Sequence, residues 1–128
     1  MSSQLPPALL NQTDEQWLET LITSIDTPMI EGTTFPGFPN KSLQATYVGS
    51  SNHKALEEAT LFHAYIKEQA ASAGKPVTPN SNFLDFGCGW GRFLRFFWKG
   101  IAPGNLCGCD TNPMILNTCA ELGVPGHL

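Results

Sequence analysis

The chain has few basic residues and no long apolar run. Lysine and arginine total 7 against 11 aspartate and glutamate residues, which gives a formal net charge of −4. That balance argues against a nucleic-acid or anionic-membrane surface, because either would need clustered positive charge. No apolar stretch approaches the roughly 20 residues that span a bilayer, and residues 1–10 lack the basic start and apolar core of a secretory signal. We therefore expect a cytoplasmic protein that contacts neither nucleic acid nor membrane.

Metal-ligand spacing is also missing. A zinc site normally shows two spaced cysteine pairs, or one pair with histidines at ligand spacing. Here Cys107 and Cys109 form a single C-x-C pair, and the three histidines are not placed to complete it. We expect no metal site. Without a secretory signal the thiols should stay reduced, and Cys107, Cys109 and Cys119 are expected to fill an apolar interior as small hydrophobic residues.

Residues 1–80 predict a helical lead-in. Thr13 and Gln16 have the spacing of a capping box, and the apolar residues that follow recur at three- and four-residue steps. A second helix is expected at about Asn52–Ser72, where apolar residues again share one face. His63 lies in that apolar stripe, and we interpret it as a packed histidine rather than a catalyst.

Two stretches of this lead-in are expected to lack regular structure. Residues 1–12 contain two prolines and should be loosely ordered. Residues 31–42 are punctuated by glycine and proline, with Phe35 and Phe38 between them. These aromatic side chains could lie over a ligand pocket, but such a segment more often pins a loop to a hydrophobic surface, and we favour that interpretation.

From residue 82 the pattern alternates between strand and helix. Short apolar segments at Phe83–Phe86 and 105–109 are each followed by a helical pattern, at residues 92–101 and Pro113–Leu122. Strands that alternate with helices predict a parallel α/β sheet. We therefore treat residues 81–128 as a second unit of the chain.

The helix expected at residues 92–101 carries its charges on one side. Arg92, Arg95 and Lys99 fall on one stripe, and apolar residues cover the rest of the helix. A charged stripe on an otherwise apolar helix is usually its solvated face, and we expect that here. The broad apolar surface should be covered in part by the N-terminal helices.

A glycine-rich turn separates the first strand from this helix. Gly87, Gly89 and Gly91 form a G-x-G-x-G pattern, and glycine allows a ligand to lie directly against the main chain. The dinucleotide pattern G-x-G-x-x-G needs a glycine where Arg92 stands, and no Gly-Lys-Ser/Thr sequence of a P-loop follows. In an open parallel sheet, ligands bind outside the carboxyl ends of the strands, where this turn lies. Asp110 ends the second strand, where a carboxylate can accept hydrogen bonds from both hydroxyls of a ribose.

The sequence Asp-Phe-Gly-Cys-Gly-Trp-Gly, from Asp85 to Gly91, closely resembles motif I of class I S-adenosylmethionine-dependent methyltransferases. The strand, glycine turn, helix, second strand and terminal Asp110 follow in the order of that family. Residues 47–51 also look like the lead-in of some bacterial relatives. The resemblance implies that residues 81–128 form the N-terminal part of a Rossmann-like class I methyltransferase fold, preceded here by two N-terminal helices. It also implies S-adenosylmethionine as the cofactor.

The resemblance assigns cofactor-binding roles but no catalytic residue. The loop of glycines, with Cys88 in it, would lie beside the methionine and ribose parts of the cofactor. Asp85 would support that loop or reach the methionine amino group. Asp110 would bind the ribose hydroxyls, and Thr111 would border the adenine. The full set implied is Asp85, Gly87, Cys88, Gly89, Gly91, Asp110 and Thr111.

The resemblance covers part of that fold. A complete domain of the family has a seven-stranded sheet, whereas this chain reaches two strands and the start of a third, so we expect an incomplete sheet from a truncated or partial enzyme. The leading hypothesis is a methyltransferase or its cofactor-binding portion, with an acceptor that the residues do not identify. The second is a non-catalytic module that binds a partner, or a second copy, through the open sheet edge. The third is a fragment that binds a nicotinamide or flavin dinucleotide.

Overall fold

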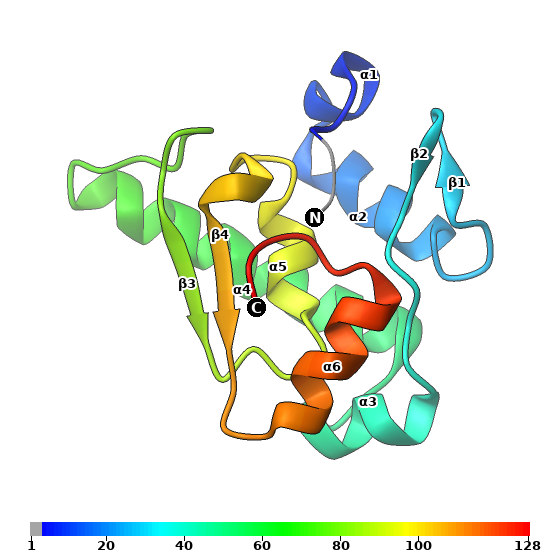
Figure 1. The fold of residues 1–128 in the computed structure, drawn as a ribbon. Helices are drawn as coiled ribbons and strands as arrows, with labels where there is room; N and C mark the ends of the chain where they lie inside the picture. The colour runs from blue at the N-terminus through cyan, green and yellow to red at the C-terminus, as the bar shows by residue number, and fades with distance from the viewer. Residues whose placement is uncertain (1–3) are drawn as a thin grey trace.

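The computed structural model describes residues 4–128, so residues 1–3 of the expected loosely ordered N-terminus lie outside it. The chain is mixed α/β, with a small parallel sheet on one side and helices packed behind it (Figure 1). Within this described part, no helix combines the length and the apolar character that a membrane crossing requires.

Within residues 4–80 the chain forms four helices and a short antiparallel hairpin instead of the two helices predicted. These elements are α1 (Pro7–Leu10), α2 (Asp14–Thr23), β1 (Met29–Ile30), β2 (Thr33–Thr34), α3 (Lys41–Val48) and α4 (Asn52–Ser72). The capping box of Thr13 and Gln16 is present at the start of α2, and α4 has the predicted bounds. The hairpin and the first residues of α3 occupy the two ends of residues 31–42, whereas residues 35–40 lack regular structure, as predicted.

The two additional helices have local causes. Pro7 begins α1 at a position where its missing N–H costs no hydrogen bond, and Leu9 is fully buried. The expectation of loose order is therefore wrong for this segment. Asn40 caps α3 by accepting a hydrogen bond from the Leu43 N–H, and Gly49 ends the helix.

The C-terminal half follows the predicted order of strand, helix, strand and helix. Its elements are β3 (Phe83–Phe86), α5 (Arg92–Phe97), the 3-10 helix η1 (Pro103–Asn105), β4 (Leu106–Cys109) and α6 (Pro113–Leu122). β3 and β4 pair in parallel, with Phe83 opposite Leu106. Helix α5 ends at Phe97, before the predicted residue 101. The chain there continues as turns that contain Gly100, a residue that disfavours helix.

The C-terminal segment lies along one edge of this sheet. His127 forms a parallel bridge with Cys107, and its N–H donates to the Leu106 carbonyl at 2.9 Å. On its other side β3 has no neighbouring strand among residues 4–128. The order across the sheet is therefore β3, β4 and the segment at His127, and the edge formed by β3 is open in this part of the chain.

Helix α5 lies between the sheet and the N-terminal helices α2 and α4. Phe35 is buried against Trp17 and Trp98, with ring centroids 5.7 and 5.3 Å away. The prediction that Phe35 pins its loop to a hydrophobic surface is confirmed. His63 is 3% exposed and packs edge-on against the Phe97 ring, so it is a packed histidine, as predicted.

The prediction of a solvated charged face on α5 is wrong. Arg95 is 1% exposed, and its guanidinium donates to the carbonyls of Pro36, at 3.2 Å, and Gly37, at 2.7 Å. The side chains of Arg92 and Lys99 are also mostly covered and donate to backbone carbonyls of the N-terminal half. The charged stripe faces other segments of the chain, whose carbonyls compensate for the lost hydration.

The sheet face opposite α5 is open in the described chain. Leu84 and Phe86 on this face are 59% and 82% exposed. Cys107 and Cys109 lie opposite them in the register and are half-buried. The prediction that these two cysteines fill an interior is wrong, because no second layer covers this face among residues 4–128. Cys119 is buried, as predicted.

Candidate functional site

The parallel pairing brings the two predicted binding segments to the same end of the sheet. Because β3 and β4 are parallel, the glycine loop that follows β3 and the turn at Asp110 that follows β4 lie at the same end of the sheet (Figure 1). The start of α6 and helix α3 lie at this end as well. The carboxyl ends of parallel strands are the usual place for a ligand in an open α/β sheet.

The glycine loop is held by the end of β4. The N–H groups of Gly87 and Cys88 both donate to the Cys109 carbonyl, at 2.8 and 2.9 Å. Gly91 has φ +83°, and a Cβ added to it would lie 2.5 Å from Cγ1 of Val124. Glycine is therefore required at position 91 both for the backbone conformation and for the close approach of the chain at Val124.

Asp110 ties the loop to the turn that follows β4. Its Oδ2 accepts a hydrogen bond from the Gly89 N–H at 3.0 Å, and its Oδ1 accepts one from the Asn112 N–H at 3.0 Å. A carboxylate has about four acceptor positions. Two of those at Asp110 therefore remain for a ligand while the intramolecular hydrogen bonds are kept.

A cavity of about 390 Å³ opens beside this carboxylate. Its lining residues are Phe86, Gly87, Cys109, Asp110 and Thr111. Three of these belong to the predicted set, and the other two are the last residues of β3 and β4. The volume lies within the range of about 300–1,000 Å³ that is usual for small-molecule sites.

Asp85 lies at the foot of the loop in an unfavourable environment for a charge. Its Oδ2 is buried and has no hydrogen-bond partner among the described residues. Burial raises the pKa of Asp85 to about 6, Arg92 opposes that rise, and Asp110 adds to it. A buried carboxylate oxygen without a partner lowers stability, and perturbed groups of this kind are found more often at functional sites than elsewhere.

The side chains of Cys88 and Trp90 face the protein interior, not the cavity. Both are buried, and Trp90 packs in an apolar cluster with Ala55 and Ile115. The hydrogen bond to Cys119, followed by burial, raises the pKa of the Cys88 thiol. Cys88 therefore contributes its backbone N–H to the loop and not its thiol. No group of three or more potential metal ligands gathers within residues 4–128.

Sequence reasoning missed two residues of this region. Asn112 is not in the predicted set, and the structure shows its side chain capping α6 and donating to the Tyr47 hydroxyl. Tyr47 was noticed as part of a lead-in, without a role. Contacts between these two residues join α3 to the turn after β4, and no local pattern in either segment indicates them.

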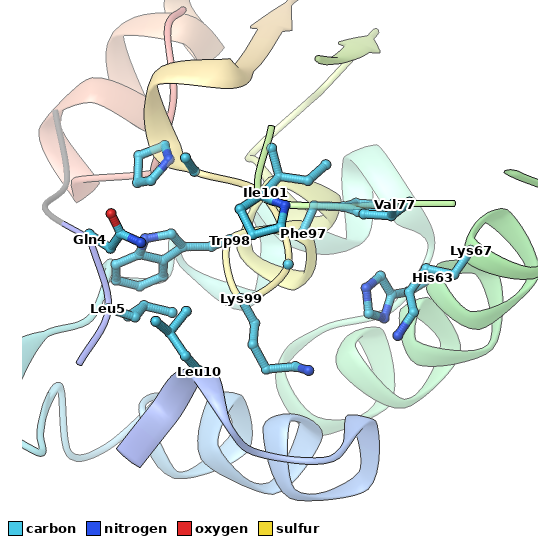
Figure 2. Close-up of a pocket in the computed structure, with 14 residues that line it drawn as sticks. Gln4, Leu5, Leu10, His63, Lys67, Val77, Phe97, Trp98, Lys99 and Ile101 are labelled. Atoms are coloured by element: carbon cyan, nitrogen blue, oxygen red, sulfur yellow. The ribbon is translucent and has the colours of Figure 1, made fainter. Parts of the chain in front are cut away.

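A second cavity, of about 360 Å³, lies at the opposite end of α5 (Figure 2). Its ammonium groups are engaged, since Lys67 contacts Asp14 at 2.7 Å and Lys99 donates to the Gln12 carbonyl at 2.9 Å. Burial lowers the pKa of His63, which lines the same cavity, to about 4, so the imidazole is neutral. This cavity contains none of the predicted binding residues.

Comparisons with known proteins add no assignment. A scan against protein-family models gives no match, and searches of curated proteins and of solved structures give none either.

Proposed function

We propose that the chain binds S-adenosylmethionine in the cavity at the carboxyl ends of β3 and β4, as the cofactor-binding part of a methyltransferase. The observation that carries the proposal is the hydrogen bond from the Gly89 N–H to Asp110 Oδ2 at the rim of this cavity. It joins the glycine loop to the one carboxylate that lines the cavity. The resemblance to class I methyltransferases depends on these two features, which are the glycines of motif I and the acidic residue after the second strand.

The residues of the cavity fit this cofactor. When bound, S-adenosylmethionine supplies a methyl group on a positively charged sulfonium, and it carries a ribose and an ammonium group. The free acceptor positions of Asp110 suit the ribose hydroxyls. Asp85 does not line this cavity, but its unpartnered Oδ2 would suit an ammonium group bound next to the glycine loop. The exposed loop backbone at Gly87 permits close approach, and Thr111 also lines the cavity.

The strand order supports the same proposal. Successive strands β3, β4 and the segment at His127 lie side by side in chain order. The first three strands of a doubly wound sheet have this arrangement. In such a sheet the ligand binds at the strand ends, between the first strand and the adjacent strand of the second half of the sheet. The open edge of β3 is the corresponding position in this chain.

Calorimetric titration with S-adenosylmethionine tests the proposal. We expect saturable binding by the wild-type chain and a loss of at least about tenfold in affinity in Asp110→Ala, because a hydrogen bond to a charged group contributes about 1.5–3 kcal/mol. Asp26→Ala, at an exposed position far from the loop in the sequence, is the matched control and should bind as the wild type does. A folded wild-type chain that gives no saturable heat would refute the proposal.

A titration with a nicotinamide dinucleotide separates the third hypothesis from the first. In the dinucleotide pattern a glycine stands where this chain has Arg92. The Arg92 guanidinium donates to the Ala55 carbonyl at 3.0 Å, so this residue has a structural role in the present fold. We expect no dinucleotide binding at concentrations that saturate S-adenosylmethionine, and tight dinucleotide binding would reverse the order of the two hypotheses.

The exposed pair Leu84 and Phe86 favours partner binding as the second candidate function. Large apolar side chains on an open sheet face are typical of surfaces that another chain covers. Light scattering during size-exclusion chromatography measures whether the wild-type chain associates with itself. If it does, a double substitution of these residues by serine should shift the chain toward the monomer, and a wild-type chain that remains monomeric at high concentration excludes self-association.

A further inference from the structure

Helix α3 reaches the glycine loop through the ring of Tyr47. A Cβ added to Gly89 would lie 3.2 Å from Cδ1 of Tyr47 and 3.6 Å from its Cγ, so the Gly89 backbone packs directly against the ring. The same ring belongs to the apolar cluster that contains Trp90, the residue between the second and third loop glycines. The N-terminal half thus forms one wall of the loop.

The hydroxyl of Tyr47 reaches the other segment of the site. It accepts a hydrogen bond of 2.9 Å from Nδ2 of Asn112. The Asn112 N–H donates to one carboxylate oxygen of Asp110, and the other oxygen accepts from the Gly89 N–H. These contacts close a ring of four residues, Tyr47, Asn112, Asp110 and Gly89. The ring joins α3, the turn after β4 and the loop after β3.

We infer that Tyr47 is a positioning residue for the cavity, because its ring and hydroxyl together set the spacing between the glycine loop and Asp110. Tyr47 does not line the cavity, so it acts through Gly89 and Asn112. The inference depends on the proposed function for its ligand. It extends the site to α3, whose sequence has no glycine motif or acidic residue to mark it.

The hydroxyl of Tyr47 distinguishes a positioning role for this residue from a role in packing alone. A residue needed only to fill space beside Gly89 could be phenylalanine. The Asn112 side chain is oriented by its own cap, since Oδ1 accepts from the Met114 N–H at 3.0 Å. This leaves Nδ2 directed at Tyr47, so removal of the hydroxyl would release the Asp110–Asn112 turn from α3 without removing the helix cap. Preorganised sites lose affinity when such a support is removed.

The test compares Tyr47→Phe with Tyr65→Phe. Tyr65 is the other tyrosine of the chain and is exposed on α4. In calorimetric titrations with S-adenosylmethionine, we expect Tyr47→Phe to weaken binding about three- to tenfold, the effect of one lost hydrogen bond. Tyr65→Phe should bind within about twofold of the wild type. Equal affinities for the wild type and Tyr47→Phe would overturn the inference.

Amide hydrogen exchange in the ligand-free chain provides a readout that needs no cofactor. In Tyr47→Phe, the N–H groups of Gly89 and Asn112 should exchange faster than in the wild type, whereas amides in the middle of α4 should not change. Unchanged exchange at both N–H groups would also overturn the inference. If the wild-type chain binds no S-adenosylmethionine, the proposed function fails, and the exchange rates alone decide whether Tyr47 holds the loop.

Discussion

Replacing Asp85 with asparagine should stabilise the chain at neutral pH and leave its stability unchanged in acid. One carboxylate oxygen of Asp85 is buried without a partner among the described residues. Burial raises the pKa of this group from 3.8 to about 6, although the Arg92 guanidinium opposes the change. Ionisation of Asp85 in the folded chain therefore costs free energy, and asparagine does not ionise.

The sign and the size of the effect follow from the two pKa values. Because the folded chain holds the proton more tightly than the unfolded chain, the free energy of unfolding falls as the pH rises from 3.8 through about 6. For a fully shielded group the difference would be about 3 kcal/mol, at about 1.4 kcal/mol per pKa unit. Asp85 is only half-buried, so solvent screening reduces the expected difference to about 1 kcal/mol.

Urea unfolding, followed by tryptophan fluorescence at about pH 3 and about pH 8, measures this difference. Asp85→Asn and the wild type should have equal stability near pH 3, below both pKa values. Near pH 8 the variant should be about 1 kcal/mol more stable. Asp26→Asn, at an exposed position, should follow the wild type at both pH values. A difference between Asp85→Asn and the wild type that is independent of pH would refute the reasoning. The same variant should bind S-adenosylmethionine more weakly, as expected for a group that lowers stability to serve a ligand.

Two further substitutions test the packing around the loop, each by urea unfolding near neutral pH. Gly91→Ala should lose about 3 kcal/mol, because its Cβ would overlap Val124 and its φ of +83° disfavours any other residue. Gly104→Ala has open space around it and should lose much less, so equal losses would contradict this account. Arg95→Leu should also lose about 3 kcal/mol, since it leaves one buried and one partly buried carbonyl without these donors. A loss no larger than that of Lys75→Leu, at an exposed position, would show that those hydrogen bonds contribute little.

Local features of the structure could be predicted because their causes are local. The capping box at the start of α2, the bounds of α4 and α6, and the parallel pairing of β3 with β4 all follow from residue spacing and element order. The same holds for the position of Asp85, Gly87 and Asp110 at one end of the sheet, because parallel strands end on the same side. Their role in binding S-adenosylmethionine stays a prediction.

Long-range features could not be predicted, because a periodic pattern shows which residues share one face of a helix but not which other segment packs against that face. Arg95 lies on a stripe that resembles a solvated surface, and it is buried only because residues 35–38 cross that side of α5. The contact of Tyr47 with Gly89 and Asn112 likewise depends on how α3 packs.

The sequence by itself therefore determined the order of the elements in the C-terminal half, the glycine loop and the acidic residues beside it. Each of these depends on backbone conformation and side-chain chemistry within a few residues. Only the tertiary structure decided the burial of Arg95, the unpartnered oxygen of Asp85 and the open face at Phe86. Burial depends on which distant segments pack against a surface, and the segment that covers Arg95 comes from the other half of the sequence.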